Sequence, residues 1–293
     1  MSPIVKAFFD QPTWTLSYVV YDNETRDAVI IDPVLNYDPA SSKISDDSHQ
    51  QIVKFIRQNE LKVHLILETH AHADHISGAQ ELKEKFPSAR IGIGKKIIEV
   101  QKLFKEIFNL DPGFKTDGSQ FDLLLEEGRE EIAGSLRIKT LFTPGHTPAC
   151  TTFVIGDAVF TGDALFMPDY GTGRCDFPSG SAESLYFSIM DKIYSLPDHF
   201  RVFVGHDYLP GGRELAYEST IGLQKKNNRM LNQNTSRLSF IQFRNERDKA
   251  LAPPRLLLPS VQVNINAGRL PQAEENGVVY LKLPVTTEKR SSR

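Results

Sequence analysis

Residues 63–75 read VHLILETHAHADH, an apolar run that leads directly into a polar cluster. Its apolar start predicts a buried strand, and the polar end holds three imidazoles and one carboxylate within six residues. In an extended backbone His70 and His72 point the same way, while Asp74 and His75 fall at the turn into the next helix. Zinc and iron take these ligand types, so the stretch predicts a metal site at a strand end, with a solvated histidine-rich loop as the alternative.

Three further polar clusters follow predicted strands. They are TPGHTP, TGDALF and GHDY, which carry His146, Asp163 and His206. Each cluster alone is weak, because a single histidine is more often structural and Gly-Asp is mostly turn chemistry. Open α/β sheets place their sites at the carboxyl ends of strands, so the four clusters together predict one common site.

The order of the predicted elements indicates the fold class. Residues 13–21 and 28–31 predict an antiparallel hairpin, and strands then alternate with amphipathic helices. Residues 37–47 predict a loop, and residues 256–263 predict an extended segment. Strands and helices in this mixed order predict an α/β protein with α+β layering, in which helices cover layered sheets.

Composition limits the classes of function. The chain has 293 residues, 40% of them hydrophobic, which is enough for a sizeable core. Its 34 basic and 37 acidic residues give a net charge of −3, so we expect neither general nucleic-acid binding nor a disordered chain. No apolar run is long enough for a membrane helix, and the start does not read as a secretory signal. We therefore expect no membrane partner and a cytoplasmic location.

The motifs resemble those of a known family. The set THAHADH, TPGHTP, TGDALF and GHDY is similar to the metallo-β-lactamase fold superfamily. Within it, the segments ETHAHADHISGA, FTPGHTPACTTFV, GRCDF and HDYLPGGR resemble the persulfide dioxygenases, also called sulfur dioxygenases, from about residue 7 to 232. The stretch LLLPSVQVNINAGRLPQAEENGVVYLKLPV resembles the tail of a bacterial branch of that family.

The resemblance implies a fold and a domain division. The fold is an αββα sandwich with the metal at one edge of its two sheets. Residues 1–240 would form the catalytic domain, and residues 241–293 a C-terminal extension packed on the same domain.

The resemblance also implies an activity: oxidation of glutathione persulfide by O₂ to sulfite and glutathione, in sulfide and persulfide detoxification. One Fe(II) per chain would be held by His70, His146 and Asp163, since two imidazoles and one carboxylate are the ligand set of non-haem iron oxygenases. The other four potential ligands would surround a vacant second position; they are His72, Asp74, His75 and His206.

Two alternatives stay open. Thioester hydrolases of glyoxalase II type use all seven side chains to hold two zinc ions, with a metal-bound hydroxide as nucleophile. A non-catalytic sensor or partner-binding protein with the same fold is the other alternative.

Glutathione carries carboxylates, which guanidinium groups bind in a bidentate way. The candidate substrate-binding residues are Arg174, Tyr208 and Arg213, although an ion pair of Arg174 with Asp176 or Asp169 is the alternative.

Relatives of the same family suggest a homo-oligomer, either a dimer or a tetramer. The two cysteines cannot form a disulfide framework, and Cys150 predicts a buried, inert thiol.

Overall fold

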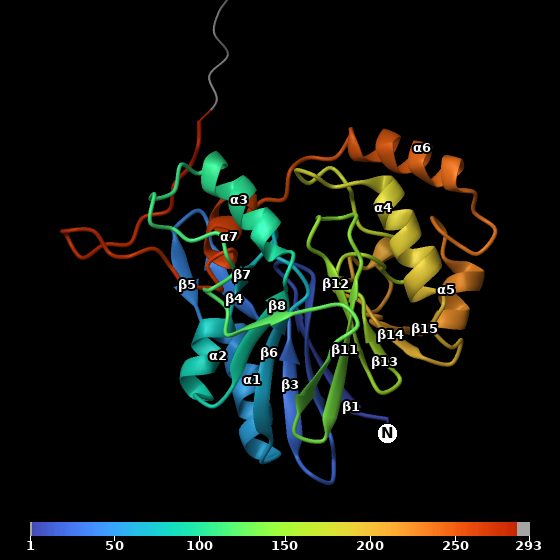
Figure 1. The fold of residues 1–293 in the computed structure, drawn as a ribbon, viewed down its shortest axis with the longest axis horizontal. Helices are drawn as coiled ribbons and strands as arrows, with labels where there is room; N and C mark the ends of the chain where they lie inside the picture. Colours follow the sequence, from blue (N-terminus) through green and yellow to red (C-terminus); the bar gives the residue numbers. More distant parts are fainter. Residues whose placement is uncertain (1, 286–293) are drawn as a thin grey trace, which may run out of the picture.

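The computed structural model describes residues 2–285, and two six-stranded sheets form its centre (Figure 1). The first sheet has the order β1-β2-β3-β6-β8-β9. Its strands are β1 (Ile4–Asp10), β2 (Thr15–Tyr21), β3 (Asp27–Ile31), β6 (Lys62–Glu68), β8 (Arg90–Gly94) and β9 (Leu123–Leu125). The predicted hairpin is confirmed, because β2 pairs with β3 in antiparallel register, and β3, β6, β8 and β9 run parallel.

The second sheet is mostly antiparallel. Its strands, in spatial order, are β10 (Glu130–Ala133), β11 (Leu136–Phe142), β12 (Thr151–Ile155), β13 (Ala158–Phe160), β14 (Arg201–Phe203) and β15 (Glu218–Thr220). Only β13 and β14 pair in parallel, and α4 (Ala182–Phe187) and the π-helix η1 (Ser188–Ile193) lie between them in the chain. A parallel neighbour requires such a crossover.

Strand β2 shows how the two sheets share their cores. All seven of its residues are buried, and alternate side chains point to opposite faces. Leu16, Tyr18 and Val20 join the core that includes the inner side chains of both sheets, whereas Val19 and Tyr21 join the core beneath the helices. The first sheet is therefore buried on both faces.

Helices cover the outer faces of the sandwich (Figure 1). The first sheet is covered by α1 (Asp47–Gln58), α2 (Ala79–Lys85), α3 (Ile97–Ile107) and α7 (Leu257–Asn264). The second is covered by α4, η1, α5 (Ile221–Asn227) and α6 (Arg237–Asp248). Ser181, Thr220 and Ser236 cap the amino ends of α4, α5 and α6 by accepting a backbone N–H. This arrangement confirms the expected αββα sandwich.

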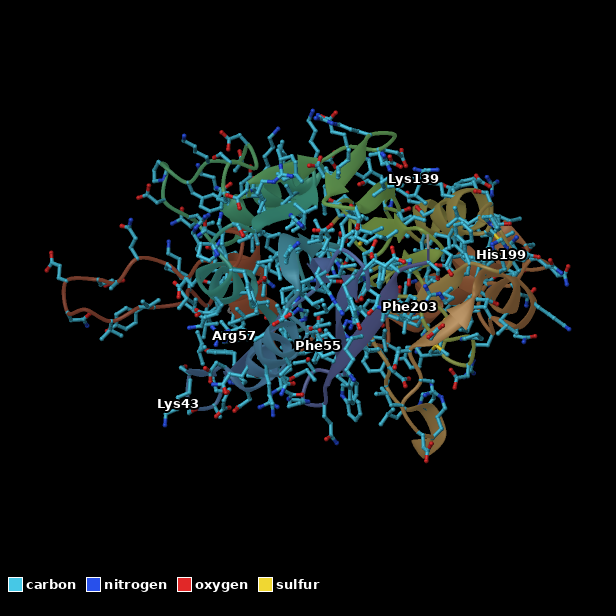
Figure 2. The ribbon with its side chains drawn as sticks, turned by 90° about the horizontal axis from the view of Figure 1, so that it is seen from below. Lys43, Phe55, Arg57, Lys139, His199 and Phe203 are labelled. Atoms are coloured by element: carbon cyan, nitrogen blue, oxygen red, sulfur yellow. The ribbon has the colours of Figure 1, made fainter. Side chains whose placement is uncertain are left out.

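Figure 2 shows how side chains divide between the interior and the surface. Lys43, Arg57 and Lys139 are exposed at the periphery, and Phe203 of β14 is buried. Among the described residues, no helix is long and apolar enough to cross a membrane.

Two local expectations were wrong. Residues 37–47, expected as a loop, contribute to a small sheet of β5 (Lys43–Ser45), β4 (Val34–Asp38) and β7 (Ile76–Ser77). Residues 256–263, expected to be extended, form most of α7. The prediction failed because nearly every side chain of this short apolar helix is buried, so its sequence shows no helical period.

The expected domain boundary at residue 240 lies inside α6. That helix packs on α4, which covers the second sheet, while α7 packs on the first sheet. The described part of residues 241–293 therefore contacts both halves of the sandwich. Residues 286–293 of the expected extension lie outside the described residues. The division itself stays a prediction.

Candidate metal centre

Four strand ends bring the predicted ligands to one edge of the sandwich. His70 follows β6 of the first sheet, while His146, Asp163 and His206 follow β11, β13 and β14 of the second. At this edge the sheets meet, because Thr15 at the start of β2 forms a β-bridge with His206. The expectation that the four polar clusters share one place is confirmed.

Two glycines permit the close approach of these loops. Gly162, next to Asp163, has a φ of +49°, and a Cβ there would lie 2.6 Å from the hydroxyl oxygen of Thr69. At Gly173 a Cβ would lie 1.9 Å from the carbonyl oxygen of Asp163. Any larger residue at either position would push apart the loops that carry the ligands.

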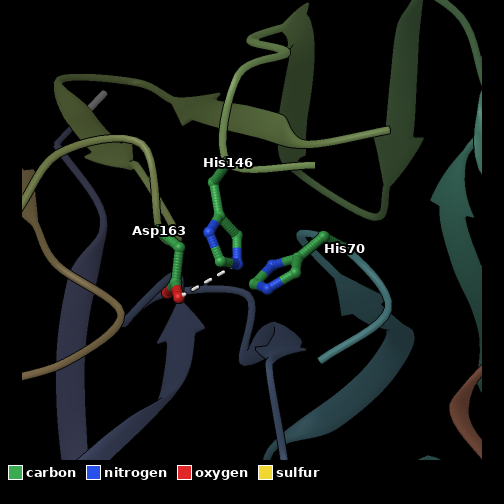
Figure 3. Close-up of side chains that lie close together, drawn as sticks. All are labelled: His70, His146 and Asp163. Carbon is green, nitrogen blue, oxygen red and sulfur yellow. Dashed lines mark ion pairs between the residues drawn. The ribbon is translucent and has the colours of Figure 1, made fainter. Parts of the chain in front are cut away.

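His70, His146 and Asp163 form the first group of candidate ligands (Figure 3). Their ligand atoms all lie within 4.8 Å of one another, and His146 Nε2 lies 3.5 Å from Asp163 Oδ2. All three side chains are buried. Two imidazole nitrogens and one carboxylate oxygen drawn from three loops fit a divalent transition metal.

Hydrogen bonds orient the two imidazoles as ligands. His146 Nδ1 lies 2.7 Å from the carbonyl oxygen of Arg174, which can only accept, so Nδ1 carries the proton and Nε2 keeps its lone pair. In His70, Nδ1 lies 3.1 Å from the hydroxyl of Thr69, and the buried Nε2 has no hydrogen-bond partner among the described residues. A buried nitrogen without a partner is costly unless something binds it, and a metal ion satisfies this need.

The charge states also suit metal binding. Burial, together with the nearby charge of His72, holds the pKa of His70 well below its ordinary value, so His70 is a neutral donor. Burial opposes ionisation of Asp163, but attraction to His206 and His146 outweighs it, so its carboxyl pKa lies below the ordinary value. The group therefore presents a neutral His70 nitrogen and an anionic Asp163 oxygen.

His72, Asp74 and His75 form a second group beside the first, again with all ligand atoms within 4.8 Å of one another. His206 Nε2 connects the groups, at 3.2 Å from Asp163 Oδ1 and 3.5 Å from Asp74 Oδ2. Burial lowers the pKa of His206, but the two carboxylates outweigh this effect and raise it to about 9. All seven predicted ligands thus lie together.

The sequence reasoning missed the residues that hold His72. Its Nε2 lies 3.0 Å from Asp32 Oδ1 and 3.2 Å from Glu68 Oε2, so Nε2 carries a proton. Burial lowers the pKa of His72, but the two carboxylates outweigh this effect and raise it well above its ordinary value. Asp32 also accepts the backbone N–H and hydroxyl of Thr69. The available signal was a carboxylate at the end of each of two buried strands, where no charge is expected without a buried partner.

Asn264 of α7 was missed as well. Its side-chain amide donates to the carbonyl oxygens of His72 and His75, both at 2.8 Å. The carboxy-terminal part of the chain therefore supports the ligand loop, and no pattern near Asn264 signals it.

A cleft of about 420 Å³ opens over His146 and Asp163. Tyr208 lines it, with its ring stacked on that of His206 at a centroid distance of 5.5 Å. Arg174 also lines it, but its guanidinium binds the carboxylate of Asp176 through two 2.5 Å contacts, as the ion-pair alternative expected.

Arg213, the third predicted substrate-binding residue, is not part of the cleft lining that the described residues form. Its guanidinium is shared between the carboxylates of Asp169 and Asp207, at 2.5 Å and 2.6 Å. This position argues against the expected role, because both faces of its hydrogen-bonding fork are already used.

Comparison with known proteins agrees with this geometry. A family model described as Metallo-beta-lactamase superfamily matches residues 13–206. The chain is 45% identical over 282 residues to "Glyoxylase B2" of Dictyostelium discoideum, covering 96% of each chain. It is 33% identical over 207 residues to the human mitochondrial persulfide dioxygenase ETHE1, covering 70% of this chain and 68% of that protein.

Among solved structures, ETHE1 from Myxococcus xanthus matches with a TM-score of 0.72 and 30% identity, covering 91% of this chain and 100% of that one. The matched family model covers every strand of the two sheets except β1 and β15, and it includes the ligand-bearing loops up to His206. The chain therefore belongs to the metallo-β-lactamase superfamily of enzymes.

Proposed function

We propose that the protein is an iron-dependent dioxygenase that oxidises glutathione persulfide with O₂ and water to sulfite and glutathione. In this reaction the S–S bond breaks, the two sulfur atoms together lose four electrons and O₂ gains four. The products are glutathione, sulfite and two protons. A ferrous ion bound at the site supplies the redox chemistry and open coordination positions.

The observation that carries the proposal is the convergence of two imidazoles and one anionic carboxylate in the first group. Two nitrogens and one carboxylate oxygen are the ligand set of non-haem iron oxygenases, and the group opens on the cleft through His146 and Asp163. The likeness to the human persulfide dioxygenase ETHE1 and to ETHE1 from Myxococcus xanthus, over two thirds or more of this chain, supports the same choice.

The chain's own residues fix the site and exclude water. Arg174 orients His146 through its carbonyl oxygen, and Asp32 and Glu68 hold His72. Phe166 lines the cleft beside Asp163 and packs edge-on against the ring of His206 at 5.9 Å. An apolar wall of this kind keeps bulk water from a reactive sulfur.

A second candidate is a dinuclear zinc thioester hydrolase. The observation in its favour is the complete second group, in which His75 Nε2 and His72 Nδ1 have no hydrogen-bond partner among the described residues. The relative named "Glyoxylase B2" at 45% identity supports it as well.

The test compares both reactions on the same protein. Metal-free protein is reloaded anaerobically with Fe(II) or with Zn(II), and each sample receives glutathione persulfide and a glutathione thioester. The proposal expects one sulfite per O₂ consumed with Fe(II), and little thioester cleavage with either metal. Rapid thioester cleavage by the zinc form without O₂ uptake by the iron form would replace it with the hydrolase.

A matched pair of variants assigns the activity to the site. Asp163→Asn removes the anionic ligand at nearly constant volume and should abolish O₂ uptake. Asp157→Asn makes the same change in a carboxylate that pairs with Arg201 away from the cleft, and should leave O₂ uptake unchanged.

A further inference from the structure

The cleft lining combines two chemically different sets of side chains. One set comes from the ligand-bearing loops and includes Asp74, His146 and Asp163. The other set is four arginines, of which three come from α6 and the segment that follows it; the four are Arg174, Arg244, Arg247 and Arg255. A molecule that reaches the metal group therefore also faces a cationic wall.

Two of these arginines are already neutralised. Arg244 is fully buried and pairs with Asp248 on the same helix. Arg174 pairs with Asp176. Neither guanidinium has a free charge to offer, since each already forms a hydrogen-bonded pair with a carboxylate.

Arg247 and Arg255 differ, because neither has a carboxylate within 4.0 Å among residues 2–285. The guanidinium of Arg247 lies 5.5 Å from the ring centroid of Tyr170, and its Nη1 contacts the sulfur of Met230 at 3.4 Å. A ring face and a thioether hold the group in place but are weak acceptors, so most of its N–H donors stay free. Arg255 is exposed at the rim.

We propose that Arg247 and Arg255 bind the carboxylates of the substrate, and that the cleft selects a dianionic, peptide-sized thiol derivative. The inference rests on the proposed function, which it deepens by assigning the substrate's acidic end to α6 and the segment after it. The reactive sulfur then lies toward His146 and Asp163. A volume of about 420 Å³ is in the range of small-molecule sites, and unneutralised cations on its wall attract anions.

This assignment replaces the expected pair of Arg174 and Arg213. Arg213 lies outside the lining, and Arg174 is committed to Asp176. The cations with free donors come instead from a part of the chain that bears no metal ligand. Specificity and metal chemistry thus reside in separate segments.

The test measures binding of S-methylglutathione to the protein as purified, by calorimetry. This probe keeps both carboxylates but has no free thiol to bind a metal. Arg247→Gln and Arg255→Gln should each weaken binding about tenfold or more, as expected for loss of a charged hydrogen bond. Lys249→Gln changes an exposed cation directly after α6 that is outside the cleft lining, and should have no effect.

The diethyl ester of S-methylglutathione supplies the second arm. It should bind the unmodified protein weakly, and the two arginine variants should not weaken it further. Equal losses for acid and ester, unchanged affinity in both variants, or no binding of the acid at all would overturn the inference.

Failure of the proposed function looks different. Arginine-dependent binding without O₂ uptake on glutathione persulfide would retain the carboxylate site and remove the dioxygenase. O₂ uptake with an unchanged KM in Arg247→Gln and Arg255→Gln would retain the dioxygenase and remove the carboxylate site.

Discussion

The ring of His146 donates its Nδ1–H to the carbonyl oxygen of Arg174 at 2.7 Å. The loop that supplies this carbonyl is held from both sides by α6. Arg244 donates to the carbonyl oxygen of Thr172 at 3.1 Å, and Asp248 accepts the N–H of Cys175 at 2.7 Å. The buried Arg244–Asp248 pair therefore fixes the acceptor that sets the tautomer of a candidate ligand.

Breaking this support should weaken metal binding. Asp248→Asn removes the charge opposite Arg244, and we expect metal affinity to fall about tenfold, as for other changes in residues that orient a ligand. Competition with a chelator measures the affinity. The paired variant Arg244→Met with Asp248→Leu avoids leaving one buried charge alone, so it should stay folded and still lose affinity. Unchanged affinity in both folded variants would contradict this role.

The two ligand groups should respond differently to truncation. Asp163→Ala should strip the iron and abolish turnover, because its carboxylate belongs to the first group. His206→Ala should leave iron bound and lower the rate more mildly. Metal analysis alongside the assay separates the cases. Iron lost from the His206 variant and retained by the Asp163 variant would mean that the occupied position is assigned wrongly.

Replacing Arg174 and replacing Arg213 should have different effects on KM. Arg174→Ala should raise KM with a smaller fall in kcat, because it leaves the carboxylate of Asp176 unpaired beside the cleft, where that charge repels an anionic substrate. Arg213→Ala should leave KM unchanged and lower thermal stability, because Asp207 is buried and would lose its partner. Initial rates at varied persulfide and a melting curve test both statements. A raised KM in the folded Arg213 variant would restore its expected role.

The cysteines should be unreactive in the folded protein. Burial raises the pKa of Cys150 to about 12 and also raises that of Cys175. Since only the thiolate reacts, about one Cys150 in ten thousand is nucleophilic at pH 8, and reactivity increases as pH rises. Alkylation with iodoacetamide at pH 8 should be slow in native protein and fast in denaturant. Rapid native labelling would show that Cys150 is accessible and ionised.

The ligand cluster could be predicted because each of its four motifs is a short stretch of sequence that can be recognised by itself. Each polar motif follows an apolar strand, and strands of such a sheet end at one edge, so His70, His146, Asp163 and His206 could be brought together without coordinates. The order of elements predicted layered sheets covered by helices, whereas the αββα sandwich itself was implied by the resemblance to the metallo-β-lactamase superfamily.

The supporting residues could not be predicted, because they act across long separations in the chain. Asp32 reaches His72 over 40 positions and Asn264 reaches it over 192, with no periodic signal at either site. Arg247 lies on a helix whose pattern does not show that it faces a cleft. Helix α7 was missed since burial on all sides removes the amphipathic period on which the prediction depends.

The assignment of a single redox-active ferrous ion to His70, His146 and Asp163 is tested by the metal content per chain of protein purified anaerobically without added metal. We expect one iron per chain and little zinc. Two zinc ions per chain would rule this assignment out and would favour the hydrolase.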